Sequence, residues 1–474
     1  KPGVIVAFEA EVEDKDWTSL YQQFSFQSNQ PVVLAKCVVT IPEGWEFFWG
    51  DWMLDGVEFS QTGNRYTWLA QNLPYREREP LSPPWSYLTK RIAVSCYDPD
   101  HRSDHFFREW TDVSRWCARV YEKPSIPLDK MIRTAKDICS NAASFDEKIE
   151  TIADFMQKEI RYVAIEIGKE RWEPRPAEKT LFNRYGDCKD KTTLMRSLLQ
   201  AQDITSIPVL AHTSRNVNRE LASPFQFNHC IIAISLPPDS RHRQSPEAVK
   251  NGWLFFDPTS STVKLGELPP ELRGSLVLLG VDGDSTLITL PYSRPSVHRK
   301  IRRLQGEIKP DGSFTARVTV IQKGDWAAFQ KQLNRNITQQ KQVERWKKEF
   351  SANIPGLNII DFQLDDHADS VIMSFMITGD QLIQKAGNFV ILHPDVFRKA
   401  KPSELKDEER QQPIWFGRAR EVESHITWSI PVSWKTSQDT FRLEGNCTGA
   451  DLSLETQCSS GRLNYHSRYR QKGK

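Results

Sequence analysis

The stretch Tyr185-Gly186-Asp187-Cys188-Lys189-Asp190-Lys191 decides how the chain is interpreted, because it begins an expected helix. Leu194, Leu198 and Ala201 follow at helical spacing and form the buried side of that helix. Unpaired backbone N–H groups and the positive end of the dipole at a helix start favour the thiolate form of cysteine. Cys188 is therefore a candidate nucleophile. The alternative is the usual fate of cysteine, a small buried side chain that fills a gap between helix and sheet.

Two later segments place an imidazole and a carboxylate at the ends of expected strands. His229 opens the apolar run Cys230–Ile234, and the run Trp253–Phe256 ends at Asp257. Taken alone, a histidine beside a strand usually packs, and Asp-Pro usually starts a turn. The order of Cys188, His229 and Asp257 favours a joint function instead. His229 would be the base, and Asp257 would bond its far ring nitrogen and hold its tautomer.

The residues next to this group have simpler expected roles. Asp187 is expected to cap the helix, and Lys189 is expected to be solvated. His212 is a rival base, but it lies in a polar, loop-like run with no strand to orient its ring.

Cysteine spacing argues against a metal site. None of the eight cysteines forms a CxxC pair. Cys230 is expected to point to the opposite strand face from His229, which disfavours a zinc site shared with Cys188. We therefore expect neither a metal nor any other cofactor. Cys447 and Cys458 could staple a hairpin in an oxidising compartment or could remain two free thiols, and the sequence favours neither.

Length, composition and charge limit the class of protein. With 474 residues, the chain has the length of about three domains of roughly 150 residues. Apolar residues make up 39% and charged residues 26%, which is typical of a folded protein in water. The formal net charge of +2 gives no electrostatic reason to expect nucleic acid as a partner. No apolar run reaches the roughly 18 residues of a membrane-spanning helix.

The pattern along the chain changes twice. Residues 1–122 contain short apolar runs separated by Pro, Gly and Asn clusters, and we expect a mainly β domain there. Residues 123–275 combine helical stripes with three later strand-like runs, which is typical of an α+β domain. An S-x-x-E capping box at Ser144 predicts one helix start in it. Residues 276–474 alternate as strands, interrupted by one long helix over roughly Trp326–Phe350.

These motifs resemble those of a known family. A GDC triplet on a helix, a histidine that opens a strand and W-x-x-x-D-P-T at the end of the next strand resemble the transglutaminase-like core of the papain-type thiol enzymes. The form RY…P…YGDCKDK…L is similar to bacterial proteins in which an all-β domain of unknown function precedes that core and another β domain follows. The resemblance is best over residues 140–262. It implies two flanking sandwich-like domains, the first lacking its initial strands in this chain.

The resemblance assigns roles to individual residues. Cys188 would be the nucleophile, His229 the general base and then acid, and Asp257 the residue that orients the imidazole. The Cys188 backbone N–H would be one oxyanion donor. Tyr162 and Trp172 are candidates for the second, and a packed core aromatic is the alternative for Tyr162.

The implied function is acyl transfer from a peptide or protein amide through a thioester, with water or an amine as acceptor. A different possibility is an inactive transglutaminase-like scaffold whose β domains bind a polymer or a protein. Acyl transfer to an arylamine is a third possibility, disfavoured by the long β flanks. The resemblance and the absence of an initiator Met lead us to expect an exported protein, periplasmic or extracellular.

Overall fold

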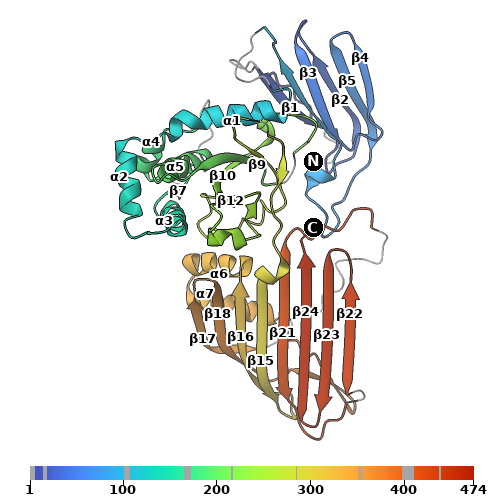
Figure 1. Ribbon diagram of the computed structural model, residues 1–474. Helices are drawn as coiled ribbons and strands as arrows, with labels where there is room; N and C mark the ends of the chain where they lie inside the picture. The colour runs from blue at the N-terminus through green and yellow to red at the C-terminus, as the bar shows by residue number, and fades with distance from the viewer. Residues whose placement is uncertain are drawn as a thin grey trace.

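The computed structural model describes residues 6–13, 19–100, 107–164, 172–214, 217–283, 285–351, 354, 356–397, 410–436 and 439–473. It has a central α/β domain between two β-rich domains (Figure 1). None of the helices in these ranges is both long enough and apolar enough to cross a membrane.

The N-terminal domain consists of two three-stranded antiparallel sheets. One has the order β1 (Ser19–Ser25), β6 (Arg91–Tyr97), β3 (Glu46–Trp52), and the other the order β2 (Val32–Thr40), β5 (Arg65–Leu73), β4 (Glu58–Thr62). Phe26, Trp68 and Ile92 are almost fully buried within one apolar cluster of this domain. Burial of each such large apolar side chain stabilises the folded domain by roughly 1.5–3 kcal/mol.

Helix α5 (Cys188–Gln200) is the centre of the middle domain. Its side chains are almost all buried, because four helices pack against it. These are α1 (Trp110–Ser125), α2 (Asp129–Ile138), α3 (Phe145–Lys158) and α4 (Ala177–Asn183). Helix α3 begins with the predicted capping box, in which Ser144 accepts the backbone N–H of Glu147 at 3.2 Å.

A six-stranded antiparallel sheet lies beside α5. Its order is β11 (Val249–Lys250), β12 (Trp253–Phe256), β10 (His229–Ser235), β9 (Ser206–Ala211), β13 (Leu276–Leu279), β14 (Ile288–Thr289). Helix α5 packs on β10 and β9. Separately, β7 (Arg161–Tyr162) pairs in parallel with β8 (Tyr185–Gly186), immediately before α5.

The limits of the middle domain differ from the predicted boundaries at 122/123 and 275/276. Helix α1 packs on α5, β9 and β13, and β13 and β14 extend the central sheet. Long-range strand pairing, which local composition does not report, accounts for the difference.

The C-terminal domain is one eight-stranded sheet rather than a sandwich of two sheets. The order is β17 (Asn358–Asp366), β18 (Ser370–Gly379), β16 (Phe314–Lys323), β15 (Arg299–Ile308), β21 (Ala419–Ser429), β24 (Arg462–Lys472), β23 (Ala450–Ser459), β22 (Thr440–Asn446). A separate hairpin joins β19 (Ile383–Ala386) to β20 (Phe389–Leu392).

Two helices, α6 (Asp325–Asn336) and α7 (Gln339–Ser351), replace the single long helix predicted here. Ile337 is extended at the break, and Thr338 accepts the backbone N–H of Lys341 at 3.4 Å, as the cap of the second helix. Trp346 and Phe350 of α7 belong to the apolar cluster of the large sheet. Helices α6 and α7 therefore cover the sheet over β16, β17 and β18.

Cys447 and Cys458 are free thiols at opposite ends of the β22–β23 hairpin. The backbone N–H of Cys447 donates to the carbonyl oxygen of Ala450 at the turn, whereas the N–H of Cys458 donates to the carbonyl oxygen of Asp439 at the open end. The two cysteines are separated by several residues of extended strand, each of which adds about 3.3 Å. Their Cα atoms are therefore too far apart for a disulfide.

Polar contacts join the three domains to one another. Arg273 of the central domain forms two 2.7 Å contacts with Asp325, the first residue of α6. Glu79 of the N-terminal domain accepts the backbone N–H groups of Gln411 and Gln412 at 2.8 and 3.1 Å.

Candidate active site

Local hydrogen bonds define the start of α5. Asp187 caps the helix, as predicted, and its Oδ1 accepts the Asp190 N–H at 3.1 Å. Lys189 is buried and forms an ion pair with Asp187, so the expectation that it would be solvated is wrong. The pairing neutralises two charges that would be costly to bury alone. Cys188 is therefore held as the first helical residue.

The segment before the cap requires a glycine. A Cβ at Gly186 would lie 2.6 Å from the Cβ of Asp190 and 3.0 Å from Thr180. Asp190 in turn accepts the backbone N–H of Arg175 at 2.9 Å. This close packing ties the loop before α4 to the first turn of α5.

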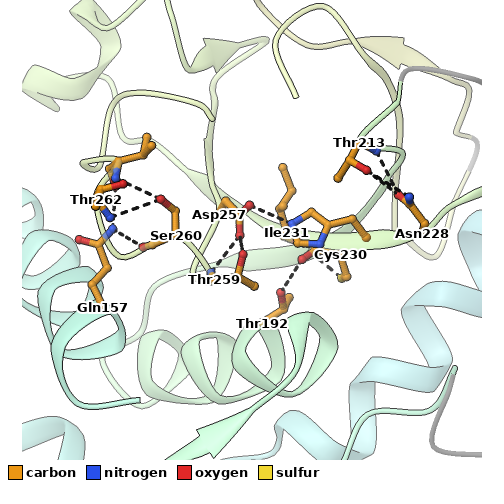
Figure 2. A network of polar contacts seen from close by, with 12 residues as sticks. Gln157, Thr192, Thr213, Asn228, Cys230, Ile231, Asp257, Thr259, Ser260 and Thr262 are labelled. Carbon is orange, nitrogen blue, oxygen red and sulfur yellow. Dashed lines mark hydrogen bonds and ion pairs between the residues drawn. The ribbon is translucent and has the colours of Figure 1, made fainter. Parts of the chain in front are cut away.

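His229 and Asp257 are joined across two neighbouring strands. His229 is the first residue of β10, and Asp257 follows the last residue of β12. His229 Nε2 and Asp257 Oδ2 are 2.8 Å apart. The other oxygen of Asp257 accepts the N–H and the hydroxyl of Thr259 at 2.9 and 2.7 Å (Figure 2).

The electrostatics of this pair favour the imidazolium. Burial lowers the pKa of His229, but the Asp257 carboxylate and hydrogen bonds with Asp257 and Cys188 outweigh it and raise the pKa to about 10. Burial raises the pKa of Asp257, yet His229 and Thr259 outweigh it and lower this pKa below its usual value. The pair is therefore charged near neutral pH.

Cys188 lines the same cavity as His229, and its side chain is one of the groups that raise the pKa of His229. Nε2 faces Asp257, so Nδ1 is the ring nitrogen left for the sulfur. The Thr192 hydroxyl of α5 donates to the Cys230 carbonyl of β10 at 3.3 Å (Figure 2). That bond fixes the helix carrying the sulfur against the strand carrying the imidazole.

Cys188 and His229 line a cavity of about 190 Å³. Aromatic side chains line it, including Trp116 and Trp172 from the central domain. Gln23 of β1 also lines it, so the N-terminal domain contributes to the site. The sequence analysis missed Gln23, because nothing in its local pattern indicates a contact with residues more than 150 positions away.

The two candidate oxyanion donors have different surroundings. Trp172 lines the cavity with Cys188 and meets Phe225 edge to face, with 4.9 Å between ring centroids. Tyr162 pairs through its backbone with Gly186, but its side chain is 46% exposed and does not line the cavity.

His212 and Cys230 also line the cavity. His212 directly follows β9, closer to an ordered strand than the sequence indicated, and its Nδ1 accepts the Ser214 N–H at 3.0 Å. Burial and Arg91 lower the pKa of His212. Burial raises the pKa of Cys230 to about 12, so its thiol keeps its proton.

Lys191 is a second residue that the sequence analysis left without a role. It is almost fully buried, and its Nζ donates to the carbonyl oxygens of Met156 and Ile160 at 3.0 and 2.5 Å. Burial lowers the pKa of Lys191 to about 8, and the charge of Asp257 partly opposes that effect.

A cysteine at a helix start, with a histidine and an aspartate from two adjacent strands, is the arrangement of a thiol enzyme. Residues 132–258 match the model of the transglutaminase-like superfamily, so the chain contains a transglutaminase-like domain. Together these findings support a cysteine-type enzyme in general.

A solved structure resembles the fold at low sequence identity. A presumed protease from Parabacteroides distasonis aligns with a TM-score of 0.54 and 11% identity, over 96% of this chain and 70% of its own. A presumed cysteine protease from Cytophaga hutchinsonii aligns at 0.21 and 12% identity, over 51% and 79%. Red sea bream transglutaminase aligns at 0.22 and 9% identity, over 94% and 91%. The last two scores are too low to support an argument, and no curated protein matches the chain.

Proposed function

We propose that this protein is a thiol enzyme that acts on a peptide or protein amide through a thioester on Cys188. The observation that carries the proposal is the His229–Asp257 contact of 2.8 Å beside the Cys188 side chain, at the edge of an open cavity. A macromolecular substrate suits a cavity to which two domains contribute.

The first half of the reaction forms the thioester. The Cys188 sulfur attacks the amide carbon, and the carbonyl oxygen becomes an oxyanion. The Cys188 backbone N–H is one donor to it, with Trp172 as our preferred second donor because it lines the same cavity as the sulfur. His229 then gives its proton to the amine as the carbon–nitrogen bond breaks.

The second half releases the acyl group. Neutral His229 takes a proton from water or from an amine as that acceptor attacks the thioester carbon. The carbon–sulfur bond breaks, and the thiolate and the imidazolium are restored. Asp257 keeps its charge throughout and stabilises the imidazolium. Water as acceptor gives hydrolysis, and a lysine amine gives a cross-link.

The test is a peptide carrying a vinyl sulfone, followed by mass spectrometry of the intact protein. We expect one adduct per chain on Cys188, no adduct in Cys188→Ala and an unchanged adduct in Cys447→Ala, whose thiol is exposed on the C-terminal sheet. New amino termini or an incorporated labelled amine, measured on a protein mixture, then identify the acceptor. An unlabelled Cys188 in folded protein would instead support the inactive scaffold.

A further inference from the structure

A second group of metal-ligating side chains lies on the C-terminal sheet. His425 of β21 and His466 of β24 are direct partners in the antiparallel pairing of these strands. Glu423 precedes His425 by two residues, so its side chain points to the same face of the sheet. Ile426 and Trp428 of β21 point to the other face, into the apolar core.

The three side chains converge on one point. Glu423 Oε1 lies 3.0 Å from His425 Nε2 and 3.3 Å from His466 Nε2. The two imidazole rings are stacked, with 4.5 Å between their centroids and 16° between their planes. Zinc binds imidazole nitrogen and carboxylate oxygen at about 2.0–2.2 Å, so tetrahedral ligand atoms lie roughly 3.4 Å apart. The observed spacings need only a small side-chain adjustment to reach that value.

The surrounding charges keep the carboxylate available. The second oxygen of Glu423 is held by Arg299 at 2.7 Å, which leaves Oε1 for the two histidines. Arg468, the cross-strand partner of Glu423, binds Glu421 at 3.1 Å, and Glu421 also binds Arg299 and Arg470. The buried Glu421 carboxylate thus holds three arginines by ion pairs and offsets one of their three positive charges. Glu455, the partner of His466 on β23, is paired with Arg442.

The exposure of the two rings leaves one side of the group open. The His425 and His466 side chains are 47% and 46% exposed, whereas Glu423 is 15% exposed. Solvent can therefore supply the remaining ligand. Imidazole nitrogen favours zinc and its transition-metal neighbours over calcium and magnesium, which prefer oxygen ligands. Among the residues that the structure describes, this is the one group of three His, Cys, Asp or Glu side chains whose ligand atoms all lie within 4.8 Å of one another.

We propose that Glu423, His425 and His466 bind a divalent transition metal of the zinc class, with a fourth position open to solvent. The bound ion would link β21 to β24. The site is independent of the proposed thiol chemistry, because none of its residues lines the Cys188 cavity.

The experiment is a zinc titration of the full chain, followed by calorimetry. It is done in the Cys188→Ala background, because a thiolate beside a histidine also attracts zinc. We expect one equivalent of zinc to bind, and His425→Ala and His466→Ala each to weaken its affinity at least 10-fold. His367→Ala, an exposed histidine in the β17–β18 connection, is the matched control and should leave zinc affinity unchanged.

Two further measurements separate ligation from folding. Zinc should raise the melting temperature of the parent protein and of His367→Ala, but not of the two site variants. Cobalt should give the visible absorption of a tetrahedral site in the parent and in His367→Ala, but not in the two site variants. Failure of zinc to bind, or equal binding by the parent and both site variants, overturns the proposal.

Discussion

Gln23 of the N-terminal domain lines the same cavity as Cys188, the first residue of α5. Its Nε2 donates to the Tyr21 hydroxyl at 2.6 Å, and the Tyr21 ring lies 6.3 Å from that of Phe225, which also lines the cavity. The amide of Gln23 is thus oriented by its own strand and has a second N–H to offer a substrate.

Gln23→Ala should lower kcat/KM about 3- to 10-fold, because the variant loses one hydrogen bond worth about 0.5–1.5 kcal/mol. Steady-state kinetics on a peptide substrate measure this change. Gln22→Ala is the matched control, since the neighbouring residue points to the opposite face of β1. Equal losses in the two variants would remove Gln23 from the binding site.

Cys188 should react with iodoacetamide near pH 7 faster than any other thiol. Its partner His229 is a cation at that pH, whereas burial of Cys117 and Cys230 raises their pKa values. Peptide mass spectrometry over time gives the rate at each cysteine, with exposed Cys447 as the internal reference. His229→Ala should bring the alkylation rate at Cys188 down to that of Cys447. An unchanged rate in His229→Ala would show that the imidazolium does not activate the Cys188 sulfur.

Asp257→Asn should reduce kcat by about 10²–10⁴, by analogy with the loss of the aspartate in serine-enzyme triads. It should also move the alkaline limb of the pH–rate profile from about 10 towards acid, because burial lowers the pKa of His229 once the carboxylate is gone. If the alkaline limb of the pH–rate profile does not move in Asp257→Asn, a group other than His229 determines that limb.

The same pair makes stability depend on pH. The folded pKa of His229, about 10, lies above its ordinary value of 6.5. Its contribution to the free energy of unfolding is therefore complete below pH 6.5 and is lost as the pH rises towards 10. Urea unfolding should show the difference between wild type and Asp257→Asn shrinking over that range.

Lys191→Met should destabilise the protein by about 1–3 kcal/mol, because the carbonyl oxygens of Met156 and Ile160 lose a buried donor. The folded pKa of Lys191 is about 8 against an ordinary 10.5, so wild type gains stability as the pH rises between these values. The variant lacks that gain, and its deficit in urea unfolding should widen from pH 8 to pH 10.5. Lys158→Met, at an exposed lysine, should show no such trend.

Local signals were enough to predict the elements that carry the thiol chemistry. The helix at Cys188, its Asp187 cap and the capping box at Ser144 depend on neighbouring residues, and all three are present in the structure. The prediction that Cys188, His229 and Asp257 meet followed from residue order and a family resemblance, and the structure supplies the 2.8 Å distance between His229 and Asp257.

Long-range pairing accounts for what the sequence analysis missed. β13 and β14 join the central sheet through β9, which lies about 65 residues earlier, and no composition change marks this connection. Lys189 is polar and follows a helix start, so it looked solvated, and only the packing of the surrounding helices explains its buried ion pair with Asp187. Cross-strand neighbours such as His425 and His466 become visible only once register is known.

The contact of Glu79 with Gln411 and Gln412 closes the three domains into a ring, because the central domain already touches both of the others. Any separation of the N-terminal domain from the C-terminal domain would therefore have to break a contact made far along the chain from Cys188.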